Sequence, residues 1–125
     1  MKQILTNTAM YQMRNNLKPF LSQRNMFGYI VARNYRMLSN ALIEYERFKN
    51  ELIQKYGERD KDEDGNLLPT MSVKIGAENF DKFCEELEPY NAIEHEVDLM
   101  TIKYSDIIGI LSGDEILSVD WMLED

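Results

Sequence analysis

The residues whose types and spacing could bind a metal ion lie in one acidic stretch. Asp60, Asp62 and Asp64 alternate with other residues and are followed by Gly65, as in the first half of a calcium-binding loop. The second half is missing, because its twelfth position is Met71 instead of a chelating glutamate. Without that residue the oxygen ligands fall short of the roughly six to eight that calcium takes. We interpret the stretch as a solvated acidic turn and keep the three aspartates as metal candidates.

The single histidine and the single cysteine offer little for catalysis. In a strand, Glu94, Glu96 and Asp98 would face away from His95, so we expect a half-buried structural histidine, with a ligand or general base as the alternative. Cys84 falls on the predicted apolar face of a helix, where a buried thiol behaves as a small hydrophobic group. Because no nucleophile-elbow, phosphate-loop, dinucleotide or zinc-protease motif occurs, the sequence predicts a protein that is not an enzyme and uses no cofactor.

The clearest element is a helix predicted from about Met26 to Tyr56 and ended by Gly57. At 1.5 Å per residue it would be about 45 Å long, more than a shorter preceding helix can cover. Part of its apolar stripe should therefore contact the second half of the chain or another subunit. We predict an interface at six positions with heptad-like spacing: Tyr35, Leu38, Leu42, Tyr45, Leu52 and Tyr56.

A shorter helix is predicted over residues 8–21, where apolar residues recur at helical spacing. Thr6 or Asn7 is its candidate N-cap. Pro19 should kink the helix or end it near Lys18, because proline lacks the backbone N–H and clashes with the preceding turn. With the second helix, this element predicts a long antiparallel helical hairpin.

The middle of the chain is polar. Residues 58–70 predict an acidic loop or hairpin turn, with a turn signal at Asp64–Gly65. A short extended run over residues 71–75 should follow. A third helix is then predicted from about Ala77 to Glu88, and it should stop before Pro89.

The last part combines a strand and a helix. Residues 94–104 alternate as a strand would, but the pattern changes phase near Leu99, which we interpret as a bulge. Ser112 and Glu115 have the spacing of a capping box and should open a final helix that runs through Leu123.

These elements predict an α+β fold, mainly α, as a single domain over residues 1–125, because 125 residues support one modest core. The N-terminal hairpin would occupy residues 1–57 and the acidic loop residues 58–70. Residues 71–125 would form a small α+β segment with one or two short strands and two helices.

The net charge of −8 is unevenly distributed: residues 1–57 carry +6 and residues 58–125 carry −14. The two halves could attract each other within the fold, or each could offer a partner a surface of one sign. The charge distribution argues against nucleic acid as a partner, because the acidic half would repel phosphates. Basic residues of the second helix also have local acidic partners, such as Glu51 with Lys55.

The expected location is the cytoplasm. One cysteine excludes an intramolecular disulfide and suits a reducing compartment. The first ten residues lack the apolar run of a signal peptide, and no window approaches the roughly 18 apolar residues of a membrane span. We therefore expect no membrane partner.

Several stretches resemble a family of small uncharacterised proteins from phages and prophages of Gram-positive bacteria: residues 46–57, the DKDEDGN loop, residues 80–87, residues 94–99 and the closing LSGDEILSVDWMLED. The resemblance covers most of the chain from Tyr45 onward and involves no catalytic residues. It implies phage origin and a place near tail and lysis genes.

The predicted function is therefore that of a non-enzymatic phage or prophage protein acting through protein–protein contacts, as an accessory or assembly factor of the tail region. It would be found in the host cytoplasm or associated with the virion. Its partner would be a phage structural protein or a host protein, and a homo-oligomer is also open. The alternative function is an acidic inhibitor of a host nucleic-acid-binding protein, whose acidic half imitates nucleic acid.

Overall fold

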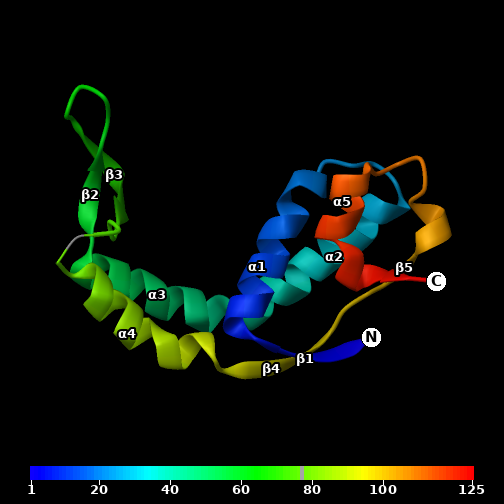
Figure 1. Ribbon diagram of the computed structural model, residues 1–125, viewed down its shortest axis with the longest axis horizontal. Helices are drawn as coiled ribbons and strands as arrows, with labels where there is room; N and C mark the ends of the chain where they lie inside the picture. Colours follow the sequence, from blue (N-terminus) through cyan, green and yellow to red (C-terminus); the bar gives the residue numbers. More distant parts are fainter. Residues whose placement is uncertain (77) are drawn as a thin grey trace. The chain divides into compact units, whose positions relative to one another are not determined.

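The computed structural model describes residues 1–76 and 78–125, which form two compact units (Figure 1). Unit 1 joins residues 1–42 to residues 94–125, and unit 2 is the stretch 43–93 between them. Both units contain helices and small two-stranded sheets, and helix predominates, so the chain is α+β and mainly α, as predicted.

The unit boundaries differ from the predicted segment boundaries. Turn residues in the sequence predict segment boundaries at Gly57 and Thr70, whereas the boundaries between the two units lie at Leu42 and Ile93. The difference arises because strand pairing and helix packing join residues that are far apart in the sequence. A single domain over the whole chain stays a prediction.

The first helix of unit 1 follows its local signals. The side chain of Thr6 accepts a hydrogen bond from the Ala9 N–H (3.1 Å) and caps α1 (Asn7–Leu17), as predicted. A 3-10 turn (η1, Lys18–Phe20) follows, with Pro19 inside it. The predicted break near the proline is confirmed, because the helical hydrogen bonding changes where proline has no N–H to donate.

The long helix predicted over residues 26–56 is two helices in the structure. α2 (Met26–Ala41) and α3 (Ile43–Tyr56) are separated at Leu42, and each belongs to a different unit. The Leu42 N–H is shared between the carbonyls four and three residues before it (3.0 and 3.2 Å), as is common at a helix end. The prediction of one continuous helix was wrong, and the long antiparallel helical hairpin is not confirmed.

Two strand pairs in unit 1 join distant parts of the chain. β1 (Lys2–Thr6) pairs antiparallel with β4 (Glu94–Asp98). β5 (Ile102–Lys103) pairs in parallel with β6 (Leu123–Glu124). The phase change near Leu99 therefore marks a change of partner strand, and the predicted bulge within one strand was wrong.

The backbone between β4 and β5 is held by Asn34, whose side chain is fully buried on α2. Its Nδ2 donates to the Met100 carbonyl (2.9 Å), and the Met100 N–H donates to its Oδ1 (2.8 Å). One amide thus satisfies both backbone groups of a residue that has no strand partner.

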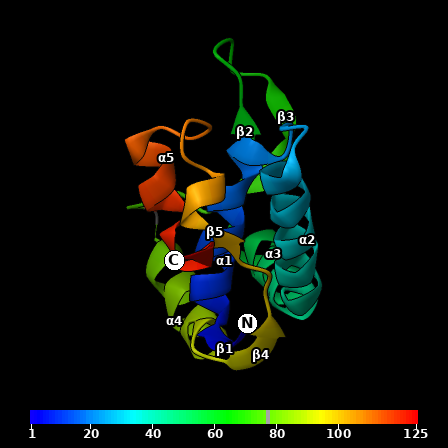
Figure 2. The same ribbon diagram turned by 90° about the vertical axis from the view of Figure 1, so that its right-hand side faces the viewer.

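The core of unit 1 lies between its helices and its C-terminal segment, and α1 and α2 lie side by side in it (Figures 1 and 2). Its C-terminal part supplies side chains from turns and short elements as well as from strands. Its buried apolar residues are Met10, Leu17, Phe20, Phe27, Ile30, Val31, Leu38, Leu42, Val97, Leu99, Ile102, Ile107, Leu111, Val119 and Met122.

The final helix is shorter than predicted. The Ser112 side chain accepts from the Glu115 N–H and the Glu115 side chain accepts from the Ser112 N–H, so the predicted capping box opens α5 (Gly113–Ser118). A 3-10 turn (η3, Asp120–Met122) and β6 replace its predicted continuation to Leu123. The β6 pairing holds that end of the chain in an extended form.

Unit 1 brings together segments of opposite charge. Residues 1–42 have six basic side chains and no acidic one, whereas residues 94–125 have one basic and nine acidic side chains. Unit 1 therefore carries −2. Unit 2, with seven basic and thirteen acidic side chains, carries −6. This packing supports the interpretation that the oppositely charged parts attract each other within the fold.

Unit 2 begins with α3 and continues into a β-hairpin. β2 (Glu58–Lys61) pairs antiparallel with β3 (Leu67–Ser72), and Gly65 takes a φ of +83° in the turn between them. The predicted turn is confirmed, because glycine adopts this left-handed conformation without a Cβ penalty. Most of the predicted acidic loop is thus a hairpin.

The second helix of unit 2 is α4 (Phe80–Asn91), which lies beside α3 (Figure 1). The start predicted at Ala77 lies outside the described residues. The predicted stop before Pro89 was wrong, because this proline lies inside the last turn. A proline there costs one hydrogen bond of the helix, and packing of the following Tyr90 on Phe48 of α3 favours its continuation.

Candidate binding site between α3 and α4

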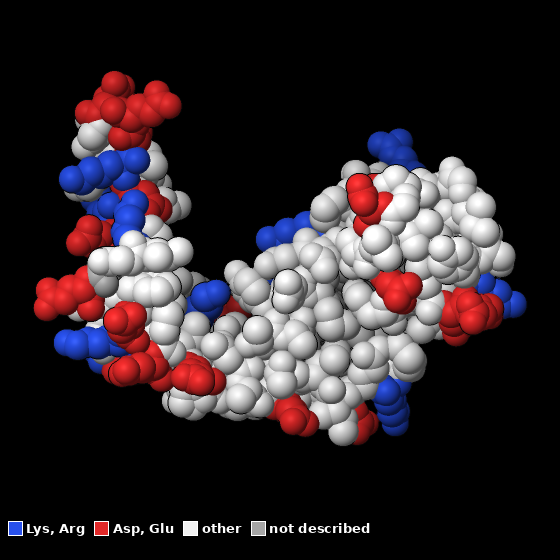
Figure 3. Space-filling view, in the orientation of Figure 1, with Lys and Arg blue, Asp and Glu red and all other residues white. Residues whose placement is uncertain are grey.

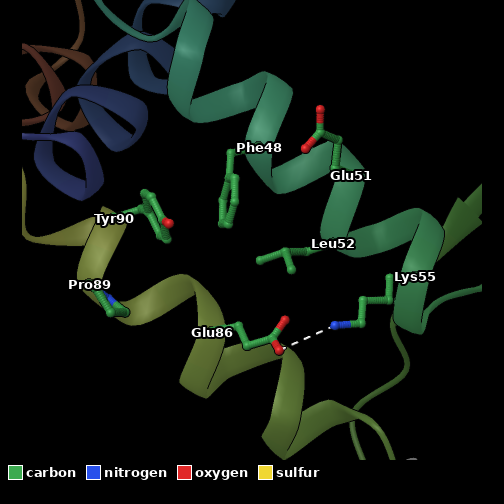
Figure 4. A pocket seen from close by; sticks show the side chains of 7 residues that line it. All are labelled: Phe48, Glu51, Leu52, Lys55, Glu86, Pro89 and Tyr90. Atoms are coloured by element: carbon green, nitrogen blue, oxygen red, sulfur yellow. Dashed lines mark hydrogen bonds and ion pairs between the residues drawn. The ribbon is translucent and has the colours of Figure 1, made fainter.

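A groove in unit 2 is lined by one face of α3 and one face of α4 (Figure 4). The α3 residues are spaced by three, four and seven positions, so they share one side of the helix. The groove encloses about 530 Å³. Its lining residues are Phe48, Glu51, Leu52, Lys55, Glu86, Pro89 and Tyr90.

One end of the groove is aromatic. The Phe48 and Tyr90 ring centroids are 3.9 Å apart and the ring planes are inclined by 31°. Leu52 continues the apolar surface and is 5% exposed, whereas Tyr90 is 36% exposed. Beside this pair, the Tyr45 hydroxyl donates to Asn91 Oδ1 (2.6 Å) and ties the ends of both helices. The result is an apolar platform on two connected helices.

The other end is closed by a charged bridge between the helices. Lys55 Nζ lies 3.4 Å from Glu86 Oε1, and the Tyr56 hydroxyl donates to the same oxygen (2.8 Å). Tyr56 and Glu86 raise the pKa of Lys55, because both favour its protonated form. Figure 4 shows the Lys55–Glu86 bridge reaching from α3 to α4.

This bridge changes the pairing that the sequence indicates. Glu51 has the spacing to pair with Lys55 along α3, but Lys55 contacts Glu86 across the groove instead. Among the described residues, Glu51 has neither an ion pair nor a hydrogen bond from its side chain. The groove therefore offers an apolar platform next to an exposed, available carboxylate.

The six predicted interface residues are mostly covered by the rest of the chain. Leu38, Leu42, Tyr45 and Leu52 are at most 7% exposed, while Tyr35 and Tyr56 are half-buried. These side chains are buried because the helix breaks at Leu42, so that the residues before the break pack in the core of unit 1 and those after it pack in the core of unit 2. The six residues therefore form no continuous exposed surface, although Leu52 lines the groove and the Tyr56 hydroxyl donates to Glu86 at its rim.

The three metal candidates do not converge. Asp60 accepts hydrogen bonds from the hydroxyls of Ser72 and Thr70, which hold the pKa of Asp60 below its usual range. Oδ1 of Asp62 accepts from two backbone N–H groups of the turn (3.0 and 2.8 Å), and Asp64 remains exposed. Among the described residues, no three metal-binding side chains gather in one place.

The predicted burial is confirmed for the histidine and wrong for the cysteine. His95 is half-buried and shares a strand face with buried Val97, as predicted. Cys84 is exposed, and the prediction of a buried thiol was wrong, because the buried face of α4 runs through Phe83 and Leu87 instead. Neither His95 nor Cys84 lines the groove.

The sequence pattern does not predict the α4 side of the groove. Pro89 predicts the end of a helix, which leaves Tyr90 outside it. The spacing of Phe83, Leu87 and Tyr90 by four and three positions was the available signal, because it continues one helical face past the proline.

Comparison of the chain with family models, with curated proteins and with solved structures gave no match. The resemblance to phage and prophage proteins therefore stays a prediction. Within the described parts of the chain, no helix has both the length and the apolar character that crossing a membrane requires.

Proposed function

We propose that this chain is a non-enzymatic protein of phage or prophage origin that acts through protein–protein contacts, and that the α3–α4 groove is its contact site. The observation that carries the proposal is the aromatic platform of Phe48 and Tyr90 beside the unpaired Glu51. Partly exposed aromatic surface rimmed by charge is typical of protein contact sites.

The Lys55–Glu86 bridge favours a binding role over general-base catalysis by Lys55. Lys55 pairs with Glu86, and its pKa is raised further above the already high value of an ordinary lysine. A general base needs a pKa near the working pH, which is a shift in the opposite direction for lysine. Such a bridge suits a role in orienting the two helices and the rim of a contact surface.

Photo-crosslinking tests the contact site. Benzoylphenylalanine is placed at Glu51, on the rim, and in the control at Asn50, an exposed neighbour on the opposite side of α3. The expected result is a discrete crosslinked protein from position 51 and little from position 50. Equal crosslinking from both positions, or none from position 51, would contradict the proposal for this groove.

The finer assignment is an accessory or assembly factor of the tail region, present in the host cytoplasm or associated with the virion. Mass spectrometry of purified virions and of assembly intermediates tests it. Recovery of the chain with tail components supports the assignment. Its absence from both preparations would contradict a tail role and leave protein contact as such in place.

The alternative, an acidic inhibitor of a host nucleic-acid-binding protein, is favoured by the β2–β3 hairpin. Asp62, Glu63 and Asp64 are exposed in its turn, and Figure 3 shows acidic side chains gathered at the end of this hairpin. Such a cluster can imitate backbone phosphates toward a basic surface. Capture of a basic protein that DNA displaces, and that a Glu63→Lys/Asp64→Lys variant fails to capture, would favour this function. Capture of tail proteins would favour the first.

A further inference from the structure

One face of α2, in unit 1, is exposed and combines apolar and basic side chains. Met26, Tyr29, Arg33 and Arg36 are spaced by three, four and three positions and therefore lie along one side of the helix. Met26 is 67% exposed and Tyr29 is 60% exposed. Tyr29 and the two arginines line a shallow hollow of about 330 Å³. Among the described residues, neither arginine forms an ion pair or a hydrogen bond from its side chain.

This α2 face and the α3–α4 groove have complementary chemistry. The face presents two apolar side chains followed by two cations, and the groove presents an aromatic platform beside the available carboxylate of Glu51. Glu85, one helical turn before Pro89, adds an exposed carboxylate beside the groove, and unit 2 as a whole carries −6. A basic amphipathic helix is therefore the ligand that this groove fits.

The two surfaces also match in length. From Met26 to Arg36 the α2 face extends about 15 Å along its helix, and α4, at twelve residues, extends about 18 Å. A single α2 face can thus follow the groove over most of its length.

We infer that the α2 face of one copy of this chain docks into the α3–α4 groove of a second copy. Tyr29 and Met26 contact the Phe48–Tyr90 platform, and Arg33 and Arg36 pair with Glu51 and Glu85. Since every copy carries both surfaces, reciprocal docking closes a dimer, and non-reciprocal docking continues into larger species. The inference rests on the proposed function, because it uses the same groove.

Sedimentation velocity tests the inference on the full chain, over about 5 to 500 µM, a range that brackets weak self-association. The mass of the wild type should rise with concentration. Raising the salt from about 0.1 to 0.5 M should weaken the association several-fold, because exposed ion pairs are screened. A monomer over the whole range would overturn the inference.

Charge reversal identifies the two surfaces. Arg33→Glu/Arg36→Glu and Glu51→Lys/Glu85→Lys should each weaken association about tenfold, since two favourable exposed pairs become repulsive. The two double substitutions combined in one chain should restore association. The matched control is Lys2→Glu/Lys18→Glu, which makes the same charge change at exposed positions outside the α2 face and should have little effect.

Weakening by both reversals without recovery in the combined chain would overturn the inference, as would equal weakening by the control. Circular dichroism confirms that each variant is folded. Crosslinking distinguishes this failure from failure of the proposed function: a monomeric wild type that still crosslinks from position 51 to a different protein overturns the second-copy inference and supports the groove as a contact site.

Discussion

Replacing Asn34 by alanine should destabilise unit 1 strongly. The side chain is fully buried and makes two hydrogen bonds, of 2.9 and 2.8 Å, with the backbone of Met100. Asn34→Ala removes both and leaves a buried donor and acceptor without a partner, at about 1 to 3 kcal/mol for each group. Because the Met100 side chain is 37% exposed, water reaches part of the freed backbone. We therefore take the lower half of the summed range and expect a loss of about 2 to 4 kcal/mol.

Urea unfolding measures this loss. Trp121, the only tryptophan, lies in unit 1, so its fluorescence follows the unit that the substitution affects. The matched control is Asn40→Ala, at an exposed position of the same helix, where a change within about 0.5 kcal/mol is expected. The control also cancels the higher helix propensity of alanine.

Amide hydrogen exchange gives an independent measure, since the Met100 N–H should lose protection in Asn34→Ala and keep it in Asn40→Ala. The reasoning is refuted if Asn34→Ala lowers the free energy of unfolding by no more than Asn40→Ala. Unchanged exchange at Met100 would likewise show that the amide clamp does not hold this segment.

Two further predictions concern the hairpin and the start of α2. Hydrogen bonds from Ser72 and Thr70 lower the pKa of Asp60 in the folded chain, so they stabilise the hairpin above the unfolded pKa, and this contribution is lost as the pH falls through the lowered folded value. NMR titration should show the Asp60 carboxyl titrating below its usual range, together with the hairpin amides, and Asp60→Asn should abolish that step. Gly28→Ala should destabilise the chain by about 2 kcal/mol in urea unfolding, because overpacking costs more than the helix propensity gained. The added Cβ would lie 2.0 Å from the Gln23 carbonyl oxygen.

Each of these has a matched control. Glu63→Gln, an exposed carboxylate in the same hairpin turn, should leave the Asp60 titration in place. An Asp60 pKa at about 4, its ordinary value, would contradict the assigned hydrogen bonds. Gly113→Ala adds a Cβ that meets nothing within 4 Å and should be neutral or stabilising. A Gly28→Ala variant as stable as Gly113→Ala would contradict the close approach at Gln23.

Local sequence signals predicted the ends and turns of several elements. The Thr6 cap, the change at Pro19, the Ser112 capping box and the turn at Gly65 all depend on dihedral angles or hydrogen bonds within a few residues. Such interactions are complete within a short segment, so residue type and spacing are enough to predict them.

The break at Leu42 had no comparable signal. The apolar spacing continues across it, and neither glycine nor proline interrupts the helix there. Tertiary packing determines where the helix breaks, because the residues before Leu42 belong to one compact unit and those after it belong to another. The pairing of β1 could not be predicted from local sequence either, because its partner strand, β4, lies about ninety positions away along the chain.

In the candidate site, too, some features follow from the sequence and others only from the packing of the two helices. The sequence determined which residues share a face of α3, because helical spacing places Phe48, Glu51 and Lys55 together. It could not determine that Lys55 pairs with Glu86 and leaves Glu51 available, because a local partner and a cross-helix partner compete for one cation. Only the packing of α4 on α3 brings the second carboxylate within reach.

The sequence also determines the total charge, whereas the fold determines which charges lie together. The sequence by itself determined a net charge of −8 and its division into a basic first half and an acidic second half. Only the tertiary structure decided that residues 1–42 and 94–125, of opposite sign, pack into one unit, while the middle of the chain retains −6. The physical reason is that formal charge adds up along the chain, whereas the field that a partner meets adds up over residues that are close in space.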